Sequence, residues 1–412
     1  MARGAFAGLS FAVPPAWLVR NGCRDLRLTI GKNALMNQAE LFRHLQSLSH
    51  PDQLWTLLRR QTSDCTLAPS ALAGLGACVL YGAGFFAREV LQQWQQAGYQ
   101  PQGLVDSNPA KWGGELEGMT IQSPAVLAQL PAGTAVVIAA MQVHGLGEPL
   151  QELGLDVWYA ERDGSIGRTP GHWLLRHPER VDKLWSSLQE NHSRQVLLYT
   201  MAARLFQQFH FPMQGNIFLN PLASSPQYFD HRVWQPRGRQ VYVDCGAFDG
   251  DSIVAFVRAL GDEHQIIAYE GDRQNYLNAQ ANLQRYQIAA QMRHCIVGGQ
   301  HDTGLSYNCR DLPGEQAVER ITLDQDLFAR AIHPTLIKMD IEGSELAALE
   351  GSRQIIQQVR PRLAICSYHT TRDLIEVPMF IIEHGENYRL ILRHHSPNTL
   401  WETVAYGEPL PA

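Results

Sequence analysis

The sequence predicts an α/β protein with two parallel-sheet units: a smaller one towards the N-terminus and a larger, doubly wound one at the C-terminus. Short apolar strand signals alternate with helical signals at residues 77–162, and again from residue 237 to 412. Such alternation indicates βαβ units and parallel sheets. The 412 residues suffice for two hydrophobic cores. Between the two stretches, residues 163–236 predict a helical linker subdomain that includes one long helix at 181–208.

The first residues of the chain predict no sheet unit. Residues 1–35 hold a weakly apolar stretch that Pro14 and Pro15 interrupt, so they make a poor secretory signal. Met36 stands directly before a segment of helical periodicity. We therefore expect residues 1–35 to be a disordered or non-native extension and residues 36–76 to be a helical segment.

Composition limits the partners. The net charge of −6 gives no general attraction to nucleic acid. The seven cysteines are odd in number and never spaced C-x-x-C, which argues against a disulfide framework and a structural zinc site. No apolar run approaches the roughly 20 residues of a membrane span. We expect a cytoplasmic protein, and the sequence leaves the oligomeric state open, a homo-oligomer included.

The first α/β stretch carries a nucleotide-binding pattern. A strand at 77–81 leads into Gly82-Ala-Gly84, a helix follows at 85–96, and the next strand, at 103–106, ends in Asp106. A strand, a glycine turn, a helix and an acid in this order match the dinucleotide fingerprint. Three interpretations stay open: a site for a nucleotide or nucleotide sugar, a fold used only for packing or dimerisation, and an NAD site. The lack of a second complete βαβ half counts against NAD.

The second α/β stretch repeats the pattern with more acids. A strand at 240–244 ends in Asp244, a turn at 245–252 contains Gly246 and Gly250, and a helix follows at 253–260. Glycines let the backbone approach a ligand closely. The turn also contains Asp249, Asp251 and Ser252, the last two being suitable helix caps. A turn this rich in acids favours a cationic ligand over a pyrophosphate.

Three further strand ends carry polar groups. The strand at 265–270 ends in Glu270, at a spacing close to the roughly 20 residues expected of a ribose-binding carboxylate. An apolar strand at 335–339 delivers Asp340, and the strand beginning at Arg362 leads to His369. Since the carboxyl ends of parallel strands meet at one edge, we expect Asp244, Glu270, Asp340 and His369 to frame a single cleft.

At this point the sequence resembles a known family. VDCGAFDGDS, AYEGD, ITLDQDL, IKMDIEGSELAALEG, SYH and LRHHSPNTLWETVAY resemble, in order, the FkbM family of S-adenosylmethionine-dependent methyltransferases, over about residues 227–408. The resemblance implies a class I, Rossmann-like methyltransferase fold at 237–412 and methyl transfer to a hydroxyl oxygen of a sugar or secondary metabolite. It implies a methionine end lined by Asp244, Gly246, Asp249 and Ser252, with Glu270 on the ribose. Gly271 and Asp272 stand where relatives often have a proline, a departure that leaves the carboxylate in place.

Methyl transfer to an alcohol needs a base. We predict Asp340 and His369 as the catalytic residues, because the ordinary pKa of histidine, roughly 6.5, lies near working pH. His395 is held in reserve, and the alternative is that His369 only orders the site. Glu342 and Glu345 are expected to stabilise a helix start. We predict no metal, although a divalent ion held by Asp340 and Glu342 stays open.

Two other function classes compete with an O-methyltransferase acting on a saccharide, nucleotide sugar or related small molecule. One is an NAD-dependent oxidoreductase, and the other is a non-catalytic nucleotide-sugar-binding protein. The acids between Asp244 and Asp251 favour a cationic methyl donor over a dinucleotide phosphate.

Overall fold

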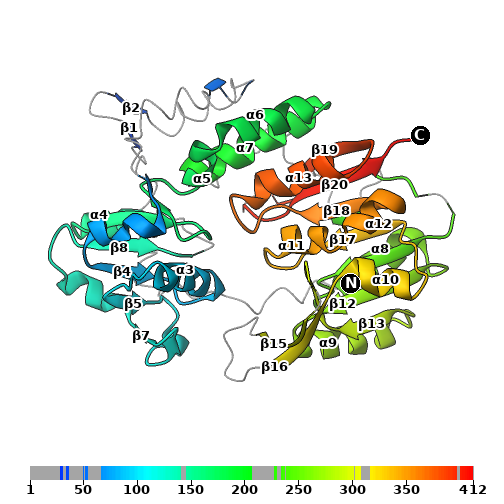
Figure 1. Ribbon diagram of the computed structural model, residues 1–412, viewed down its shortest axis with the longest axis horizontal. Helices are drawn as coiled ribbons and strands as arrows, with labels where there is room; N and C mark the ends of the chain where they lie inside the picture. Colours follow the sequence, from blue (N-terminus) through cyan, green and yellow to red (C-terminus); the bar gives the residue numbers. More distant parts are fainter. Residues whose placement is uncertain are drawn as a thin grey trace, which may run out of the picture.

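The computed structural model contains two β-sheet units with helices between them (Figure 1). It describes residues 28–30, 34–36, 50, 52–53, 66–140, 145–206, 227–229, 233–236, 238–300, 302–307, 316–396 and 400–411. Strands β1 (Leu28–Ile30) and β2 (Ala34–Met36) pair antiparallel. Most of the predicted 1–35 extension and of the 36–76 helical segment lies outside the described residues. Within the latter, Pro69–Leu75 forms the 3-10 helix η1.

The N-terminal sheet has eight strands in the order β3-β10-β9-β8-β4-β5-β7-β6. Its central strands β9, β8, β4, β5 and β7 run parallel, and β3, β10 and β6 add antiparallel edges. The strands are β3 (Thr66–Leu67), β4 (Cys78–Tyr81), β5 (Gly103–Val105), β6 (Glu115–Leu116), β7 (Met119–Gln122), β8 (Ala135–Ile138), β9 (Asp156–Ala160) and β10 (Ile166–Gly167). The sequence predicts three strands here, at 77–81, 103–106 and 134–140, so the sheet is larger than expected.

Helices cover both faces of this sheet because successive strand residues point to opposite sides. Cys78 and Leu80 pack with η1 and α3 (Phe85–Gln96), whereas Val79 and Tyr81 pack with the other face. That other face is covered by η3 (Pro124–Gln129) and α4 (Gly147–Glu152). The short η2 spans Pro109–Lys111.

The C-terminal sheet has seven strands in the order β13-β12-β11-β17-β18-β20-β19. Strand β20 runs antiparallel to both of its neighbours, and the others are parallel. The strands are β11 (Val241–Cys245), β12 (Gln265–Glu270), β13 (Gln291–His294), β17 (Leu336–Met339), β18 (Arg362–Cys366), β19 (Tyr388–His394) and β20 (Thr403–Pro409). A separate sheet, β14-β16-β15, is formed by Ile296–Val297, Gln316–Ile321 and Asp302–Tyr307.

This sheet is also covered on both faces. On one face, Tyr242 and Ala268 pack with α8 (Asp251–Leu260), α9 (Arg273–Arg285) and η4 (Gln227–Phe229). On the other, Val243 and Ile267 pack with α10 (Leu323–Ala329), α11 (Glu345–Glu350), α12 (Arg353–Gln358) and α13 (Asp373–His384). The arrangement agrees with the doubly wound fold that the sequence predicted at 237–412.

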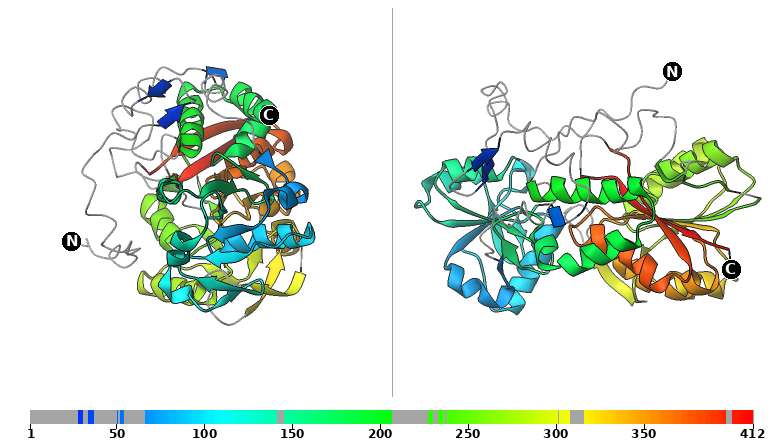
Figure 2. Two further views of the ribbon diagram at one scale, coloured as in Figure 1. Left: turned by 90° about the vertical axis from the view of Figure 1, so that its left-hand side faces the viewer. Right: turned by 90° about the horizontal axis from the view of Figure 1, so that it is seen from above.

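Helices α5 (His172–Arg176), α6 (Pro178–Ser187) and α7 (Asn191–Phe206) lie between the two sheets in Figures 1 and 2. They have no separate core: Val181, Leu184 and Val196 share the core of the C-terminal sheet. The single helix predicted at 181–208 is wrong, because the chain is extended at Leu188 and α7 begins afresh. Glu190, in this break, pairs with Arg393 of β19 at 2.7 Å.

Other strand ends differ from the prediction as well. Strand β18 ends at Cys366, so His369 lies in the loop that follows it. The sequence also predicts a last strand at 400–406; the structure has that strand, β20, at Thr403–Pro409, and β19 precedes it as an antiparallel partner. In the described part of the chain, no helix combines the length and apolarity needed to cross a bilayer.

Candidate functional site

The glycine turn after β11 is packed too tightly for any side chain at Gly246. The backbone of Gly246 has φ +83°, and a Cβ built there would lie 1.9 Å from the carbonyl oxygen of Asp340. The N–H groups of Gly246 and Ala247 both donate to the Tyr269 carbonyl, at 2.9 and 3.1 Å. The turn is thereby pinned between β12 and the loop after β17.

Replacing Gly246 with alanine is expected to destabilise the protein by more than about 2 kcal/mol, since backbone strain and a collision add together. Gly261→Ala is the matched control: Gly261 has φ +90° with no atom within 4 Å of its virtual Cβ. That variant carries the backbone strain alone. Urea unfolding of both variants measures the difference, and equal losses would contradict the tight packing at position 246.

Glu270 lies directly beside this turn. Its Oε2 accepts from the Phe248 N–H at 2.8 Å, and its Oε1 accepts from the Asp272 N–H at 2.8 Å. Burial raises the pKa of Glu270 above its ordinary value, and the two N–H groups oppose part of that rise. Phe248 is 49% exposed and has φ +49°, so the turn presents an aromatic ring to solvent next to the carboxylate.

Asp244 and Ser252 contact each other instead of an open surface. Asp244 is completely buried. Its Oδ2 accepts from the Ser252 hydroxyl and, at 3.0 Å, from the Tyr242 hydroxyl, while its Oδ1 lies 3.0 Å from Lys338 Nζ. Lys338 also donates to the Gly246 carbonyl at 2.7 Å. These contacts support the glycine turn from its buried side. Asp244 therefore does not line a cleft together with Glu270, Asp340 and His369.

Asp249 is half-buried in the turn. Its Oδ1 accepts from the Asp251 N–H at 3.3 Å, and its carbonyl accepts from Asn282 at 2.8 Å. The expected capping by Asp251 and Ser252 is wrong: the N-cap of α8 is Gly250, with no side-chain cap. The Ser252 hydroxyl donates to Asp244 instead, because the buried carboxylate needs donors.

Asp340 lies where β17 ends and receives several donors. Tyr228 and Tyr368 donate their hydroxyls to its Oδ2 and Oδ1, at 2.9 and 3.0 Å. Burial alone would raise the pKa of Asp340, but Lys338 and His369, with the two hydroxyls, hold it below its ordinary value. Asp340 is therefore ionised at neutral pH. Its side chain is 26% exposed, so it remains accessible.

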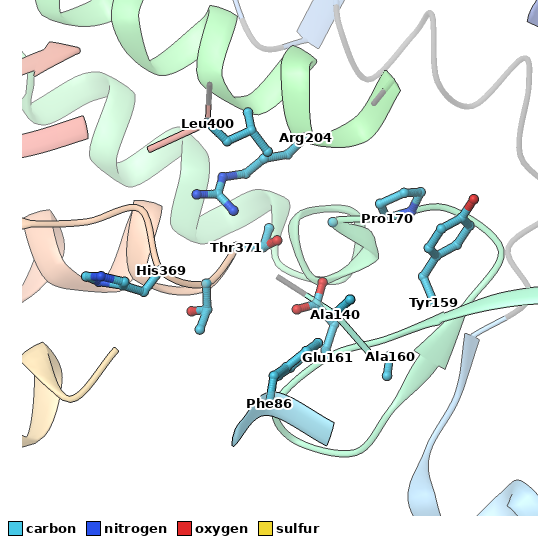
Figure 3. A pocket seen from close by; sticks show the side chains of 12 residues that line it. Phe86, Ala140, Tyr159, Ala160, Glu161, Pro170, Arg204, His369, Thr371 and Leu400 are labelled. Carbon is cyan, nitrogen blue, oxygen red and sulfur yellow. The ribbon is translucent and has the colours of Figure 1, made fainter. Parts of the chain in front are cut away.

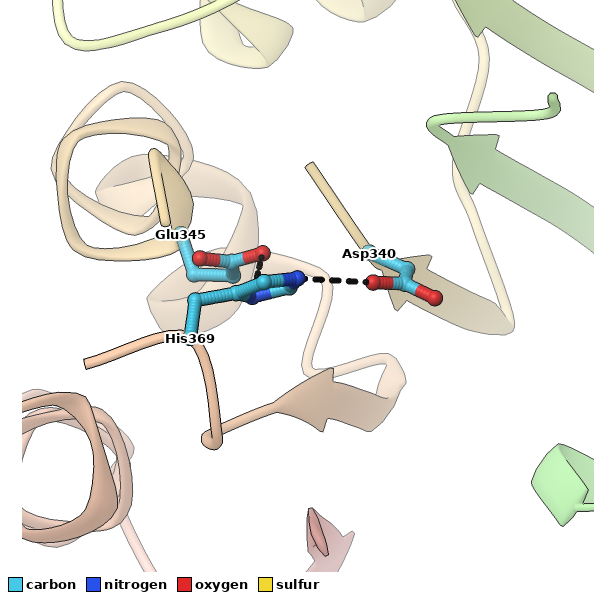
Figure 4. Close-up of side chains that lie close together, drawn as sticks. All are labelled: Asp340, Glu345 and His369. Carbon is cyan, nitrogen blue, oxygen red and sulfur yellow. Dashed lines mark ion pairs between the residues drawn. The ribbon is translucent and has the colours of Figure 1, made fainter. Parts of the chain in front are cut away.

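His369 lies between the carboxylates of Asp340 and Glu345 (Figure 4), and Glu342 Oε2 lies 3.6 Å from its Nε2. Its Nε2 lies 3.4 Å from Asp340 Oδ1, and its Nδ1 lies 3.1 Å from Glu345 Oε1. Burial alone would lower the pKa of His369, but Glu345, Asp340 and Glu342 raise it to about 9. The ring is consequently a buried imidazolium at neutral pH, with a side chain only 3% exposed. The prediction that its ordinary pKa suits a base does not fit this environment.

Glu345 and Lys338 are functional candidates that the sequence reasoning missed or misjudged. Glu345 is completely buried and accepts the Ile341 N–H at 2.8 Å, so it does more than stabilise a helix start. Asp340, Glu345 and His369 lie close enough to hold a metal ion. However, the two carboxylates face different ring nitrogens, which describes an ion-paired imidazolium. A lysine inside an apolar strand, as at 338, is the sequence signal that could have revealed the partner of Asp244.

The N-terminal glycine turn has a similar geometry. Asp106 Oδ2 accepts from the Ala83 N–H at 2.7 Å, and Lys111 Nζ lies 3.6 Å from the same carboxylate oxygen. Gly82 has φ +120°, and a Cβ there would lie 2.3 Å from the Ala139 carbonyl. The structure thus brings Gly82, Gly84 and Asp106 together at the carboxyl end of β4. The reserve candidate His395 instead contacts the Tyr406 hydroxyl, at 2.9 Å.

Comparisons with known proteins agree with the C-terminal part of this description. A family model described as "Methyltransferase FkbM domain" matches residues 244–394. The chain is similar to the solved structure of methyltransferase FkbM from Methylobacillus flagellatus KT. The TM-score is 0.51 and the sequence identity 22%, over 82% of this chain and 92% of that one. This likeness shows a shared fold.

Two other solved structures are less similar. An rRNA methylase from Streptococcus thermophilus has a TM-score of 0.30 and 14% identity, over 42% of this chain and 88% of that one. UDP-D-quinovosamine 4-dehydrogenase from Vibrio fischeri has a TM-score of 0.20 and 19% identity, over 22% of this chain and 90% of that one. A search of curated proteins finds no match.

Proposed function

We propose that the protein transfers a methyl group from S-adenosylmethionine to a hydroxyl of a saccharide, nucleotide sugar or related metabolite, a proposal that the match of residues 244–394 to the FkbM methyltransferase domain model supports. The observation that carries the proposal is the contact between the glycine turn after β11 and the residue that follows β17, Asp340. The glycine turn held by Glu270 packs against Asp340, whose carboxylate is ionised and accessible. A donor at the turn would place its methyl group beside Asp340.

The residues around the glycine turn suit a positively charged ligand that carries a ribose. Glu270 keeps lone pairs free on both oxygens, and a carboxylate accepts from both ribose hydroxyls in a charge-assisted pair. The exposed ring of Phe248 lies next to Glu270 and offers an apolar surface to the adenine of the donor. Asp249 is half-buried in the turn and adds negative charge. Asp244 and Ser252 support the turn without contacting the donor.

Asp340 is the group that we assign as the proton acceptor. When bound, S-adenosylmethionine supplies a methyl group on a positively charged sulfur. The acceptor hydroxyl gives its proton to Asp340 as its oxygen bonds to the methyl carbon, and the sulfur keeps the electron pair of the broken bond. His369 is a positioning residue, since both of its ring nitrogens face carboxylates.

For the N-terminal turn, we propose a site for the nucleotide or other handle of the acceptor. The contact between Asp106 and the Ala83 N–H supports this assignment, because it repeats the contact between Glu270 and Phe248. Lys111 adds a positive charge that suits a phosphate.

A thermal-shift panel tests the donor assignment on the full chain. S-adenosylhomocysteine at about 100 times its dissociation constant should stabilise the protein by about 2.7 kcal/mol, which raises the melting temperature by several degrees. Incubation with S-adenosylmethionine and a panel of saccharides and nucleotide sugars, read by mass spectrometry, tests methyl transfer. Stabilisation by NAD without any effect of S-adenosylhomocysteine would favour the oxidoreductase alternative and overturn the proposal.

A further inference from the structure

A cavity between the two sheets contains a buried cation with few partners. It is lined by residues of the N-terminal sheet unit, of the loop after β18 and of α7: Phe86, Ala140, Tyr159, Ala160, Glu161, Pro170, Gly171, Arg204, His369, Thr370, Thr371 and Leu400. Figure 3 shows Arg204 and Glu161 entering it from different sides, near His369. Both sheets therefore turn carboxyl-end loops towards one cavity, which is where open α/β sheets place ligands.

Arg204 is the cation. It is 8% exposed, and its guanidinium donates to the Tyr368 carbonyl, while Nε has no partner. Among the described residues no carboxylate forms an ion pair with Arg204. Burial lowers the pKa of Arg204 to about 10, although the carboxylates of Asp373 and Glu161 oppose the fall, so Arg204 stays charged at neutral pH. A buried charge without a paired counterion is costly, and an anion would offset that cost.

The first turn of α3 adjoins the same space. Phe86 lies in that turn, and Gly84, the N-cap of this 12-residue helix, offers no side-chain cap. Free N–H groups and the helix dipole favour an anion at such an end. Arg204 and the start of α3 thus both favour a negatively charged ligand. The cavity volume of about 60 Å³ suits a carboxylate or phosphate group better than a whole sugar.

We propose that this cavity binds an anionic group, a carboxylate or a phosphate, carried by the methyl acceptor, with Arg204 as its main ligand. That the anion belongs to the acceptor rests on the proposed function, since the cavity borders His369, which contacts Asp340. The acceptor then lies with its anion on Arg204 and its reacting hydroxyl beside Asp340. A neutral sugar would leave the guanidinium with only the longer-range attraction of the Asp373 and Glu161 carboxylates.

Glu161 makes the anion site sensitive to pH. Burial, with Asp163, raises the pKa of Glu161 to about 7, although Arg204 and Arg176 oppose the rise. His172, 4.0 Å from Glu161, has a pKa lowered to about 4 by burial and is neutral. A bound anion raises the pKa of Glu161 further, so the protonated acid donates to the anion. Anion binding should therefore weaken as the pH rises above about 7.

Calorimetry on the full chain tests the proposal with glucuronate, inorganic phosphate and glucose. We expect glucuronate or phosphate to bind and glucose not to, and the tighter of the two anions identifies the source of the charge. Arg204→Gln should weaken anion binding at least tenfold. Arg194→Gln, on the same helix but not lining the cavity, is the matched control and should leave binding unchanged. Binding of glucose as tight as that of glucuronate, or an unchanged affinity in Arg204→Gln, would overturn the assignment.

Two measurements keep this test separate from folding and from the proposed function. If Arg204→Gln fails to fold, Thr371→Leu, which fills the cavity without removing a charge, should abolish anion binding; retained binding there contradicts the proposal. S-adenosylhomocysteine binding is measured on the same samples. Anion binding without S-adenosylhomocysteine binding would refute the methyltransferase proposal alone, and the reverse result would refute the anion site alone.

Discussion

Glu270→Ala is expected to lower the affinity for S-adenosylhomocysteine by about a hundredfold or more. In the proposed donor site the variant would lose two charge-assisted hydrogen bonds to the ribose, each worth roughly 1.5–3 kcal/mol. It also releases the Phe248 N–H, which Oε2 holds at 2.8 Å, so the turn loses its support. Titration calorimetry of the variant against the wild-type protein measures the loss.

Glu263→Ala is the control, because Glu263 is exposed and precedes the same strand. Stability should change little in Glu270→Ala. Burial raises the pKa of Glu270, so its ionised form costs folding free energy at neutral pH, and removing the charge relieves that cost. An affinity within threefold of wild type would place the ribose elsewhere.

His369→Gln is expected to remove a stabilisation that depends on pH. The pKa of His369 is raised from 6.5 to about 9 in the folded protein. A raised histidine pKa stabilises fully below about pH 6.5, and the effect is lost as the pH rises through about 9. The rise corresponds to about 3 kcal/mol. Urea unfolding at pH 6 and pH 10 should show the wild-type advantage shrinking by roughly that amount.

The same variant distinguishes positioning from base catalysis. If the imidazolium holds Asp340 in place, kcat of the wild type should fall as the pH rises through about 9. The pH profile of His369→Gln should lack this alkaline fall. We expect kcat of the variant to fall by about a hundredfold with KM nearly unchanged. His333→Gln is a control, since this exposed histidine precedes β17, whereas Asp340 follows the other end of that strand, and since its ring contacts Phe328. A rising limb through pH 9 would make neutral His369 the base.

Local patterns in the sequence predicted the strand–turn–helix units well. The residues at 240–270 encode a buried strand, a glycine turn and an acid-terminated strand, and β11, α8 and β12 form there. Helix α3 spans Phe85–Gln96, as its periodicity indicates. The single helix expected at 181–208 failed because Glu190 is engaged by Arg393, which lies on β19. Periodicity in one segment cannot reveal a partner two hundred residues away.

By itself the sequence determined the doubly wound C-terminal fold, the position of Glu270 beside the glycine turn and the candidates Asp340 and His369. Only the tertiary structure decided their chemical states. Asp244 is buried and forms an ion pair with Lys338. The carboxylates of Glu345 and Asp340 keep His369 protonated. Arg204, from α7, lines the cavity next to His369. The physical reason is that strand and turn preferences act between neighbours in the chain, whereas desolvation and charge pairing depend on which distant side chains packing brings together.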